Sequence, residues 1–372
     1  MKRVSMMVLI LGACLVSVAW GQQPAGTCVN NWSEFHRTNM QRWNPCEKIL
    51  NVKDVRNLGL KWSYDTDDAV DSSPAVDNGV AYVASFGGNV YALNARTGTK
   101  LWSYTTTGYV YSSPAIANGV VYIASYGGNV YALNAHTGTL LWNYTTGSFV
   151  ASSPAVADGV VYVGSGDHNI YALNAKTGAK LWNYATGDIV VSSPAVANGV
   201  VYVGSEDGNV YALNARTGAK LWSHTASYVQ SSPAVVNGVV YIGSDALYAL
   251  NASTGAVLWS HDTGGGYSSP AVASGVVYIG SFDYNVYALD ATTGAKLWSY
   301  ATDSFVDSSP AVANGVVYIG SEDGNVYALN ARTGAKLWSY STGFRVTSCP
   351  AVANGILYVG SDFNHVYAFG LK

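Results

Sequence analysis

Acidic side chains occur at positions where the copies of a repeated sequence differ from one another. Asp71 and Asp307 occupy equivalent positions, each directly before a Ser-Ser-Pro motif. Carboxylates in such a place can bind a hard cation such as calcium together with backbone carbonyls, or they can be solvated acids that face water. The sequence leaves both interpretations open.

The same variable segments carry further acids and aromatic rings, which suit the recognition of a partner or a ligand. We assign no catalytic residue and no metal ligand. The candidate binding residues are Asp71, Phe86, Tyr111, Tyr126, Asp167, His168, Glu206, Asp207, Tyr267, Phe282, Asp283, Tyr284, Asp307, Glu322, Asp323 and Phe363. Loops on a rigid scaffold often carry binding sites, although solvated loops also vary without any function.

The histidines are not expected to form a site. His168 and His365 fall in separate repeats, and His224 and His261 each replace a tyrosine of the repeat on an outer strand. A catalytic triad or a three-ligand metal centre needs side chains that converge, so neither is predicted.

A repeat of about forty residues must position these side chains. Its phase is marked by Trp62, Trp102, Trp142, Trp182, Trp222, Trp259, Trp298 and Trp338. Self-similarity at this period is typical of propeller blades or solenoid coils. Each unit holds four short apolar runs with an Asn-Gly or similar hairpin signal between the first two, which predicts a four-stranded antiparallel blade.

Eight copies of the inner-strand motif predict eight blades. The copies begin at residues 72, 112, 152, 192, 231, 268, 308 and 348. The last copy ends without a tryptophan strand, whereas Leu60–Tyr64 supplies one before the first copy. We therefore predict an all-β, eight-bladed β-propeller over residues 58–372, in which the N-terminal strand completes the last blade and closes the ring.

Alternating strand directions place the loops on two faces of this propeller. We call variable face the one that carries the second-to-third and fourth-to-first loops, which hold all the candidate binding residues. We call uniform face the opposite one, where the turns hardly change and basic residues such as Arg96, Lys100 and Lys176 gather. The disc should be electrically polar although its net charge is only -3.

The charge balance and the N-terminus limit the possible locations and partners. A net charge of -3 offers nucleic acid no general attraction. Residues 1–21 are predicted to be a secretory signal, followed by a leader over 22–57, so the protein is expected in the periplasm or outside the cell. Leu11–Cys14 allows a second interpretation, a lipoprotein anchored through Cys14. No later segment is apolar enough to span a bilayer.

The remaining cysteines are Cys28, Cys46 and Cys349. We favour a disulfide between Cys28 and Cys46, which an oxidising compartment permits. Cys349 replaces a serine of the repeat and is either a free thiol or the true partner of a leader cysteine. The leader is expected on the outside of the propeller, and the alternative is a plug or a partner-binding arm.

The segment Ala92–Trp102 resembles the tryptophan-docking motif of the pyrroloquinoline quinone (PQQ) repeat propellers, and related copies include Ala212–Trp222 and Ala328–Trp338. The resemblance implies an eight-bladed propeller without implying that PQQ binds. One branch of the family contains PQQ- and calcium-dependent alcohol dehydrogenases, which have long insertions at one mouth. The other contains compact scaffolds of outer-membrane assembly. This chain resembles them more in its size and in its lack of long insertions.

The function expected from this resemblance is that of a non-catalytic, monomeric scaffold that binds an envelope or secreted protein on its variable face, without a cofactor. The first alternative is a PQQ- and calcium-dependent dehydrogenase, with PQQ stacked near Tyr111 or Tyr267 and Asp307 as calcium ligand or general base. The second is a carbohydrate-binding propeller.

Overall fold

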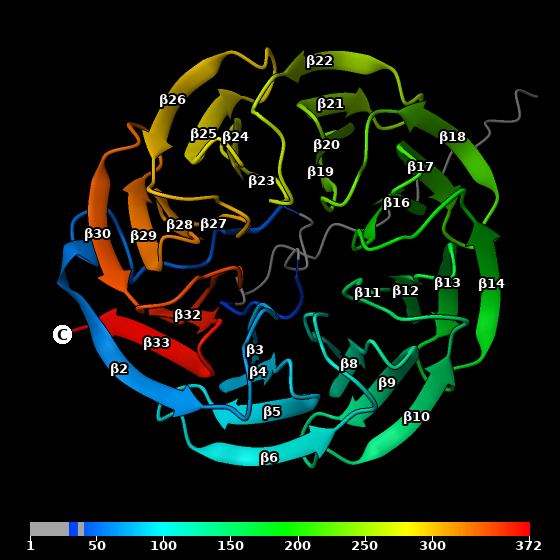
Figure 1. The fold of residues 1–372 in the computed structure, drawn as a ribbon, viewed down its shortest axis with the longest axis horizontal. Coiled ribbons are helices and arrows are strands. Elements are labelled where there is room, and N and C mark those ends of the chain that lie inside the picture. Colours follow the sequence, from blue (N-terminus) through cyan, green and yellow to red (C-terminus); the bar gives the residue numbers. More distant parts are fainter. Residues whose placement is uncertain (1–29, 36–40) are drawn as a thin grey trace, which may run out of the picture.

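A computed structural model describes residues 30–35 and 41–372 of the chain. Eight antiparallel sheets surround a central axis, and the chain visits them in order around the ring (Figure 1). In each blade the strand nearest the axis is short and the outermost strand lies at the rim. The predicted eight-bladed, all-β propeller is confirmed.

Seven blades consist of four strands that follow one another in sequence, from the axis outward. Blades 1 to 4 contain β3 (Ala75–Asp77), β4 (Val80–Ala84), β5 (Asn89–Asn94), β6 (Lys100–Thr105); β7 (Ala115–Ala117), β8 (Val120–Ala124), β9 (Asn129–Asn134), β10 (Leu140–Thr145); β11 (Ala155–Ala157), β12 (Val160–Gly164), β13 (Asn169–Asn174), β14 (Lys180–Ala185); β15 (Ala195–Ala197), β16 (Val200–Gly204), β17 (Asn209–Asn214) and β18 (Lys220–Thr225).

Blades 5 to 7 continue this order, and blade 8 combines the two ends of the ring. Their strands are β19 (Ala234–Val236), β20 (Val239–Gly243), β21 (Leu247–Asn251), β22 (Val257–His261); β23 (Ala271–Ala273), β24 (Val276–Gly280), β25 (Asn285–Asp290), β26 (Lys296–Ala301); β27 (Ala311–Ala313), β28 (Val316–Gly320), β29 (Asn325–Asn330), β30 (Lys336–Ser341); and β31 (Ala351–Ala353), β32 (Ile356–Ser361), β33 (His365–Leu371) and β2 (Leu58–Asp65).

The N-terminal strand closes the ring as predicted. β2 is the outermost strand of blade 8 and pairs antiparallel with β33, so that Tyr64 lies opposite Val366. A short 3-10 helix, η1 (Val55–Asn57), precedes β2. Because the first and last strands share one sheet, the ring has no open blade between its two ends.

Tight turns at the uniform face follow from the sequence. Asn118 and Gly119, between β7 and β8, have φ angles of 52° and 76°. Asparagine and glycine tolerate this left-handed region better than other residues, which is why they form two-residue hairpins. The inner strand begins at the alanine after Ser-Ser-Pro, so the two serines that we assigned to the strand lie outside it.

The recurring tryptophans join neighbouring blades. Trp182 in β14 donates its indole N–H to the carbonyl of Ala215 in blade 4 at 2.9 Å, and the hydroxyl of Tyr162 donates to the same oxygen at 3.1 Å. A Cβ added to Gly218 would lie 2.7 Å from the Trp182 ring, so only glycine lets that turn approach the indole. The same arrangement recurs at six other seams. Between blades 7 and 8, Trp338 donates instead to the carbonyl of Leu58 at 3.2 Å, and the buried hydroxyl of Tyr318 has no hydrogen-bond partner among the described residues.

A closed circle of hydrogen bonds surrounds the axis at the level of the Ser-Ser-Pro motifs. In each blade the backbone N–H of the second residue donates to the side chain of the equivalent residue in the next blade. Ser73 donates to Ser113, and so on through Ser153, Ser193, Ser232, Ser269 and Ser309 to Cys349, whose N–H donates to Ser73. Cys349 is a free, buried cysteine, so the alternative that it pairs with a leader cysteine is wrong.

Residues 30–35 and 41–45 of the leader lie inside the ring. They contribute carbonyl acceptors to the inner strands of several blades, and β1 (Trp43–Asn44) pairs parallel with β27. The backbone hydrogen bonds join Val76 to Trp32, Ile116 to Ser33, Val272 to Gln41 and Val312 to Arg42. Our expectation that the leader packs on the outside is wrong for residues 30–35 and 41–45, because the channel edges of the inner strands carry N–H groups that need acceptors. This placement corresponds to the plug that we considered as the alternative.

Arg42 is fully buried in this plug. Its guanidinium donates to the carbonyls of Phe35 and Pro310 at 2.5 and 2.8 Å and to those of Ser309 and Pro350 at 3.4 Å. It also lies over the rings of Trp32 and Phe35. Burial lowers the pKa of Arg42. The guanidinium thus ties the leader to blades 7 and 8 at the axis.

The leader leaves the channel across the uniform face. Glu47 is buried, and its carboxylate accepts hydrogen bonds from the backbone N–H groups of Ile49, Leu50 and Gly355 and from the side chain of Asn30. The leader therefore occupies the end of the channel that faces the uniform side. Cys46 is disulfide-bonded, and its predicted partner Cys28 lies outside the described residues, so the pairing stays a prediction.

Candidate functional site

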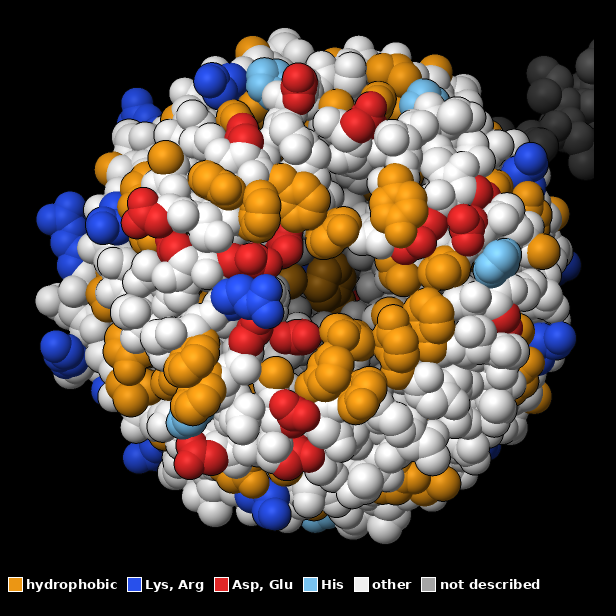
Figure 2. Space-filling model, in the orientation of Figure 1, with side chains coloured by type: hydrophobic (Ala, Val, Ile, Leu, Met, Phe, Trp, Pro, Cys, Tyr) orange, Lys and Arg blue, Asp and Glu red, His pale blue; other side chains and the backbone are white. Residues whose placement is uncertain are grey.

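The two loop sets of the variable face meet around the axis. In most blades the second residue after the second strand donates its backbone N–H to the loop that enters the same blade, as Tyr126 does to Tyr109 at 2.7 Å and Glu322 to Phe305 at 2.9 Å. Figure 2 shows this face, with aromatic and acidic side chains gathered around a central hollow. We call the rim of this hollow the mouth.

Five aromatic rings form a continuous series over blades 1 to 3, which we call the first aromatic arc. It consists of Phe86, Tyr109, Tyr111, Tyr126 and Phe149. The ring centroids lie 4.5 Å apart for Phe86 and Tyr109, 4.9 Å for Phe86 and Tyr111, 5.2 Å for Tyr111 and Tyr126 and 4.4 Å for Tyr126 and Phe149. The three tyrosines are 38–53% exposed. Exposed rings in contact with one another form an apolar surface that a partner can cover.

A second aromatic arc lies over blades 6 and 7. It consists of Tyr267, Phe282, Tyr284 and Phe305, with centroid distances of 4.9 to 5.2 Å between successive contacts. Phe344 and Phe363 stack separately in blade 8, with centroids 4.0 Å apart and planes at 6°. The aromatic residues predicted as binding residues thus belong to groups rather than standing alone.

Between the two arcs lies a group of charged and polar residues that we call the mouth cluster. It consists of Asp71, Asp307, Glu322, Arg345, Thr347 and Asp362. Arg345 is 62% exposed and forms ion pairs with Asp362 at 3.2 Å and with Glu322 at 3.9 Å. Thr347 donates to Asp362 at 2.9 Å or to Asp71 at 3.2 Å.

The mouth cluster places each of two aspartates beside a second carboxyl group. Burial, together with the neighbouring carboxyl of Asp362, raises the pKa of Asp71 to about 6. Burial and the neighbouring Glu322 raise the pKa of Asp307 to about 7. One carboxyl oxygen of Asp307 is buried and lacks a hydrogen-bond partner within the described part of the chain. A single guanidinium does not balance these four carboxyl groups.

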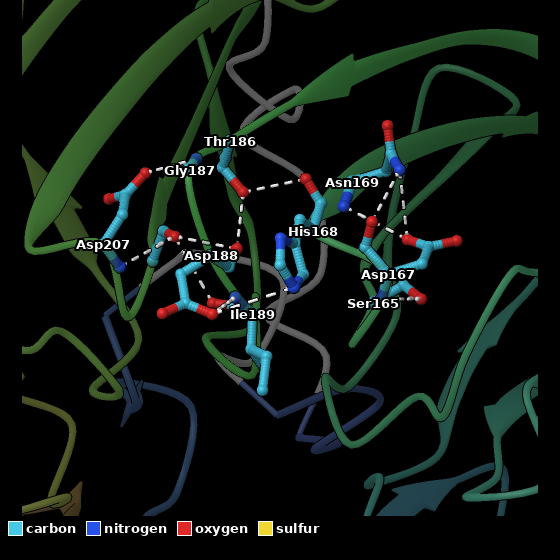
Figure 3. Close-up of polar contacts among 10 residues, drawn as sticks. Ser165, Asp167, His168, Asn169, Thr186, Gly187, Asp188, Ile189 and Asp207 are labelled. Carbon is cyan, nitrogen blue, oxygen red and sulfur yellow. Dashed lines mark hydrogen bonds and ion pairs between the residues drawn. The ribbon is translucent and has the colours of Figure 1, made fainter.

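Four of the predicted binding residues stabilise turns instead of facing the mouth. Asp167 accepts hydrogen bonds from the hydroxyl of Tyr171, the side chain of Asn169 and the backbone N–H of Gly147. Asp207 makes the same contacts one blade on, and Figure 3 shows it accepting from the N–H of Gly187. Although burial opposes it, the hydrogen bond from Tyr171 helps lower the pKa of Asp167. The equivalent residues are Asp283 and Asp323.

The two remaining candidates lie apart from the mouth cluster. His168 Nε2 lies 3.7 Å from Asp188 on the loop beside it (Figure 3). Glu206 accepts a hydrogen bond from Gln230 at 2.6 Å. Neither contact brings these residues to Asp71 or Asp307.

Three members of the mouth cluster, Arg345, Thr347 and Asp362, were not among the predicted binding residues. A comparison of the copies offered a signal. Arg345 stands three residues before its Ser-Cys-Pro motif, and no other repeat has a lysine or arginine at that position. Tyr109, Phe149 and Phe305 were missed because their loops have no hallmark that separates a stacked ring from a solvated one.

Comparison with known proteins identifies the family. The family model described as outer membrane protein assembly factor BamB, of the PQQ repeat type, matches residues 54–153, 146–262, 228–348 and 322–371. The chain belongs to this PQQ-repeat family. The match takes in the whole ring, so every blade supports it.

The individual proteins that resemble this chain include both enzymes and an assembly factor. A stretch of 102 residues is 34% identical to lupanine 17-hydroxylase [cytochrome c] of Pseudomonas sp, and covers 25% of this chain and only 15% of that protein. BamB from Moraxella catarrhalis has a similar structure, with a TM-score of 0.72 at 23% identity over 84% of this chain and 99% of that one. A europium-containing methanol dehydrogenase reaches a TM-score of 0.81 at 16% identity over 92% and 98%. The structural likenesses show the fold alone.

The mouth does not fit PQQ. PQQ is an aromatic quinone with three carboxylic acid groups, so its site must provide cations or hydrogen-bond donors. The mouth offers four carboxyl groups and one guanidinium, which is already paired with Glu322 and Asp362. Among the described residues no three acidic, histidine or cysteine side chains are arranged to hold a metal ion. Bringing a triply charged anion next to this mouth cluster would be electrostatically unfavourable.

Proposed function

We propose that this protein is a non-catalytic scaffold of the cell envelope that binds a protein partner on its variable face. The observation that carries the proposal is the mouth itself, where two arcs of exposed, touching aromatic rings flank a cluster of partly buried carboxyl groups. Aromatic rings are enriched at the centres of protein interfaces, where they bury a large area at low entropic cost.

The matched family model supports the scaffold. The matched family model carries the description of an outer-membrane assembly factor. Among residues 30–35 and 41–372 no helix is long and apolar enough to cross a membrane. We infer that the chain is exported by its N-terminal signal over residues 1–21 and acts in the periplasm or outside the cell, with anchoring through Cys14 as the alternative.

The test uses a photo-reactive amino acid placed in the full-length protein in its native host. One version carries it at Tyr126 on the variable face, and the control carries it at His136 in an exposed turn of the uniform face. A discrete crosslinked protein from position 126 and none from 136 is the expected result. Equal crosslinking from both positions would contradict the proposed face.

The dehydrogenase alternative is tested separately on the purified protein. PQQ and calcium are added together, binding is followed by calorimetry, and alcohol oxidation is followed with an electron-accepting dye. We expect neither saturable binding nor turnover, because of the charge of the mouth. Binding with turnover would replace the scaffold by the quinoprotein enzyme.

A further inference from the structure

In the mouth cluster, Asp71 and Asp307 form no ion pair with a positively charged partner among the described residues. Asp71 lies beside Asp362, and Asp307 lies beside Glu322, so the carboxyl groups form two neighbouring pairs. Arg345 reaches one member of each pair, Asp362 and Glu322. The buried oxygen of Asp307 remains without a hydrogen-bond donor in the part of the chain that is described. A second cation would complete the arrangement that Arg345 begins.

A tyrosine ring lies near one carboxyl pair, and the backbone of a second-arc residue contacts the other pair. Tyr111 of the first arc is close enough to Asp71 that the aspartate charge, after burial, raises the pKa of its hydroxyl. Phe305 of the second arc accepts the backbone N–H of Glu322 through its carbonyl. In Figure 2 aromatic and acidic side chains adjoin one another around the hollow. A ligand that enters there contacts carboxylates and ring faces together.

Arginine is the side chain that suits both kinds of group. Its guanidinium is planar, stays charged, pairs with two carboxylate oxygens at once and stacks on aromatic faces. Lysine offers a point charge without the planar surface, and a sugar offers no charge to balance the carboxyl groups. The mouth therefore selects for an arginine by charge and by shape.

We propose that the mouth binds an arginine side chain on an extended segment of the protein partner, with the guanidinium between the two carboxyl pairs and the neighbouring apolar side chains on the first aromatic arc. This inference rests on the proposed function, because it specifies what the partner presents to the variable face. The charged or titratable groups that face the guanidinium are Asp71, Asp307, Glu322, Asp362, Arg345 and Tyr111.

The probe is a synthetic peptide, acetyl-Gly-Leu-Arg-Leu-Gly-amide, titrated into the full mature protein at pH 8 and low salt. The matched peptide carries citrulline in place of arginine, which keeps the shape and removes the charge. We expect saturable binding of the arginine peptide and at least about tenfold weaker binding of the citrulline peptide, the effect of one lost charge-assisted contact. Binding should weaken at pH 5, where Asp71 and Asp307 are protonated.

Variants locate the binding site. Asp307→Asn and Tyr111→Ala should each weaken the arginine peptide several-fold, and alanine is safe at position 111 because Ala151 occupies the equivalent place in blade 3. Asp158→Asn on the uniform face is the control, since Asn118 and Asn198 stand at that position in other blades. Loss of affinity in Asp158→Asn, or equal affinity for both peptides, would overturn the proposal.

Two further outcomes separate this inference from the proposed function. If neither peptide binds while position 126 still crosslinks to a discrete protein, the scaffold function stands and the arginine is wrong. If neutral maltoheptaose binds and Tyr111→Ala abolishes that binding, the mouth is a sugar site and both proposals fail.

Discussion

At the scale of single residues, chemically identical aspartates have opposite environments. Asp167 sits in a turn where a tyrosine hydroxyl and a backbone N–H donate to it, and its charged form is stabilised. Asp307 sits beside another carboxyl group, partly buried, and its neutral form is stabilised. The first aspartate stabilises the fold, and the second is one that the proposed arginine would contact.

The pKa of Asp307 makes a prediction about stability. Because the pKa is about 7 in the folded state and 3.8 in the reference state, the folded protein holds the proton more tightly, and stability falls as pH rises from about 4 to 7. Asp307→Asn removes this loss and should raise the free energy of unfolding at pH 8 by about 1 kcal/mol or more, with little change at pH 4. Urea unfolding at both pH values measures it. Asp158→Asn should show no such difference, and an equal gain at pH 4 would contradict the assignment.

The difference between these aspartates also marks how far the sequence predicts the site. The repeat placed both on the variable face, since strand alternation alone decides that. It could not tell that Asp167 would accept from Tyr171, four residues on, or that Asp71 would meet Asp362 from the far end of the chain. Contacts of the second kind depend on ring closure, which brings residues nearly 300 positions apart side by side.

At the scale of the elements, an indole and a phenol that share one carbonyl join neighbouring blades at seven of the eight seams. The fold was predictable here because seven copies repeat one signal, the tryptophan and the glycine turn that receives it. The course of the leader was not predictable, because Trp32, Arg42 and Glu47 occur once each and no second copy shows which contacts matter.

Trp182→Phe tests the seam between blades 3 and 4. Phenylalanine keeps most of the apolar contact and removes the donor to Ala215, whose carbonyl still accepts from Tyr162. We expect a loss of about 1 kcal/mol in the free energy of unfolding. Trp182→Ala should cost about 3–5 kcal/mol, because it also leaves a cavity. Chemical denaturation compares the two, and equal losses would show that the hydrogen bond, not the packing, holds the seam.

The circle of serines predicts the behaviour of Cys349. Cys349→Ser restores the residue of the other seven blades, so stability should change by less than about 0.5 kcal/mol. Cys349→Ala removes the acceptor for the N–H of Ser309 and should cost about 1 kcal/mol. Since the folded thiol is 7% exposed, a colorimetric thiol reagent should modify it only as fast as the protein opens. Immediate reaction in native buffer would contradict this burial.

At the scale of the whole molecule, the two ends of the channel differ. The described leader fills the uniform-face end, whereas the mouth at the variable face carries the charged and aromatic groups (Figure 2). The two ends of the channel thus differ in structure. The chain itself closes one end, and the other end is open to solvent.

Arg42 is the residue through which this plug can be tested. Arg42→Ala removes a donor from four carbonyl groups at the axis. We expect a loss of about 3–5 kcal/mol, as when one side of a buried polar contact is deleted, measured as a lower midpoint of thermal or urea unfolding. Arg56→Ala, at an exposed position of η1, should change the midpoint little. If both variants unfold alike, the leader does not stabilise the ring.

The pairing of β2 with β33 makes the first blade strand in the chain the last to find its neighbour. Until residues 365–371 have been made, the seven intermediate blades can stack while β2 stays unpaired. A chain cut short by a nonsense codon or by proteolysis therefore carries a bare strand edge, which a chaperone or a protease can read as the sign of an unfinished protein. Completion of blade 8 therefore depends on the synthesis of its last strand, β33.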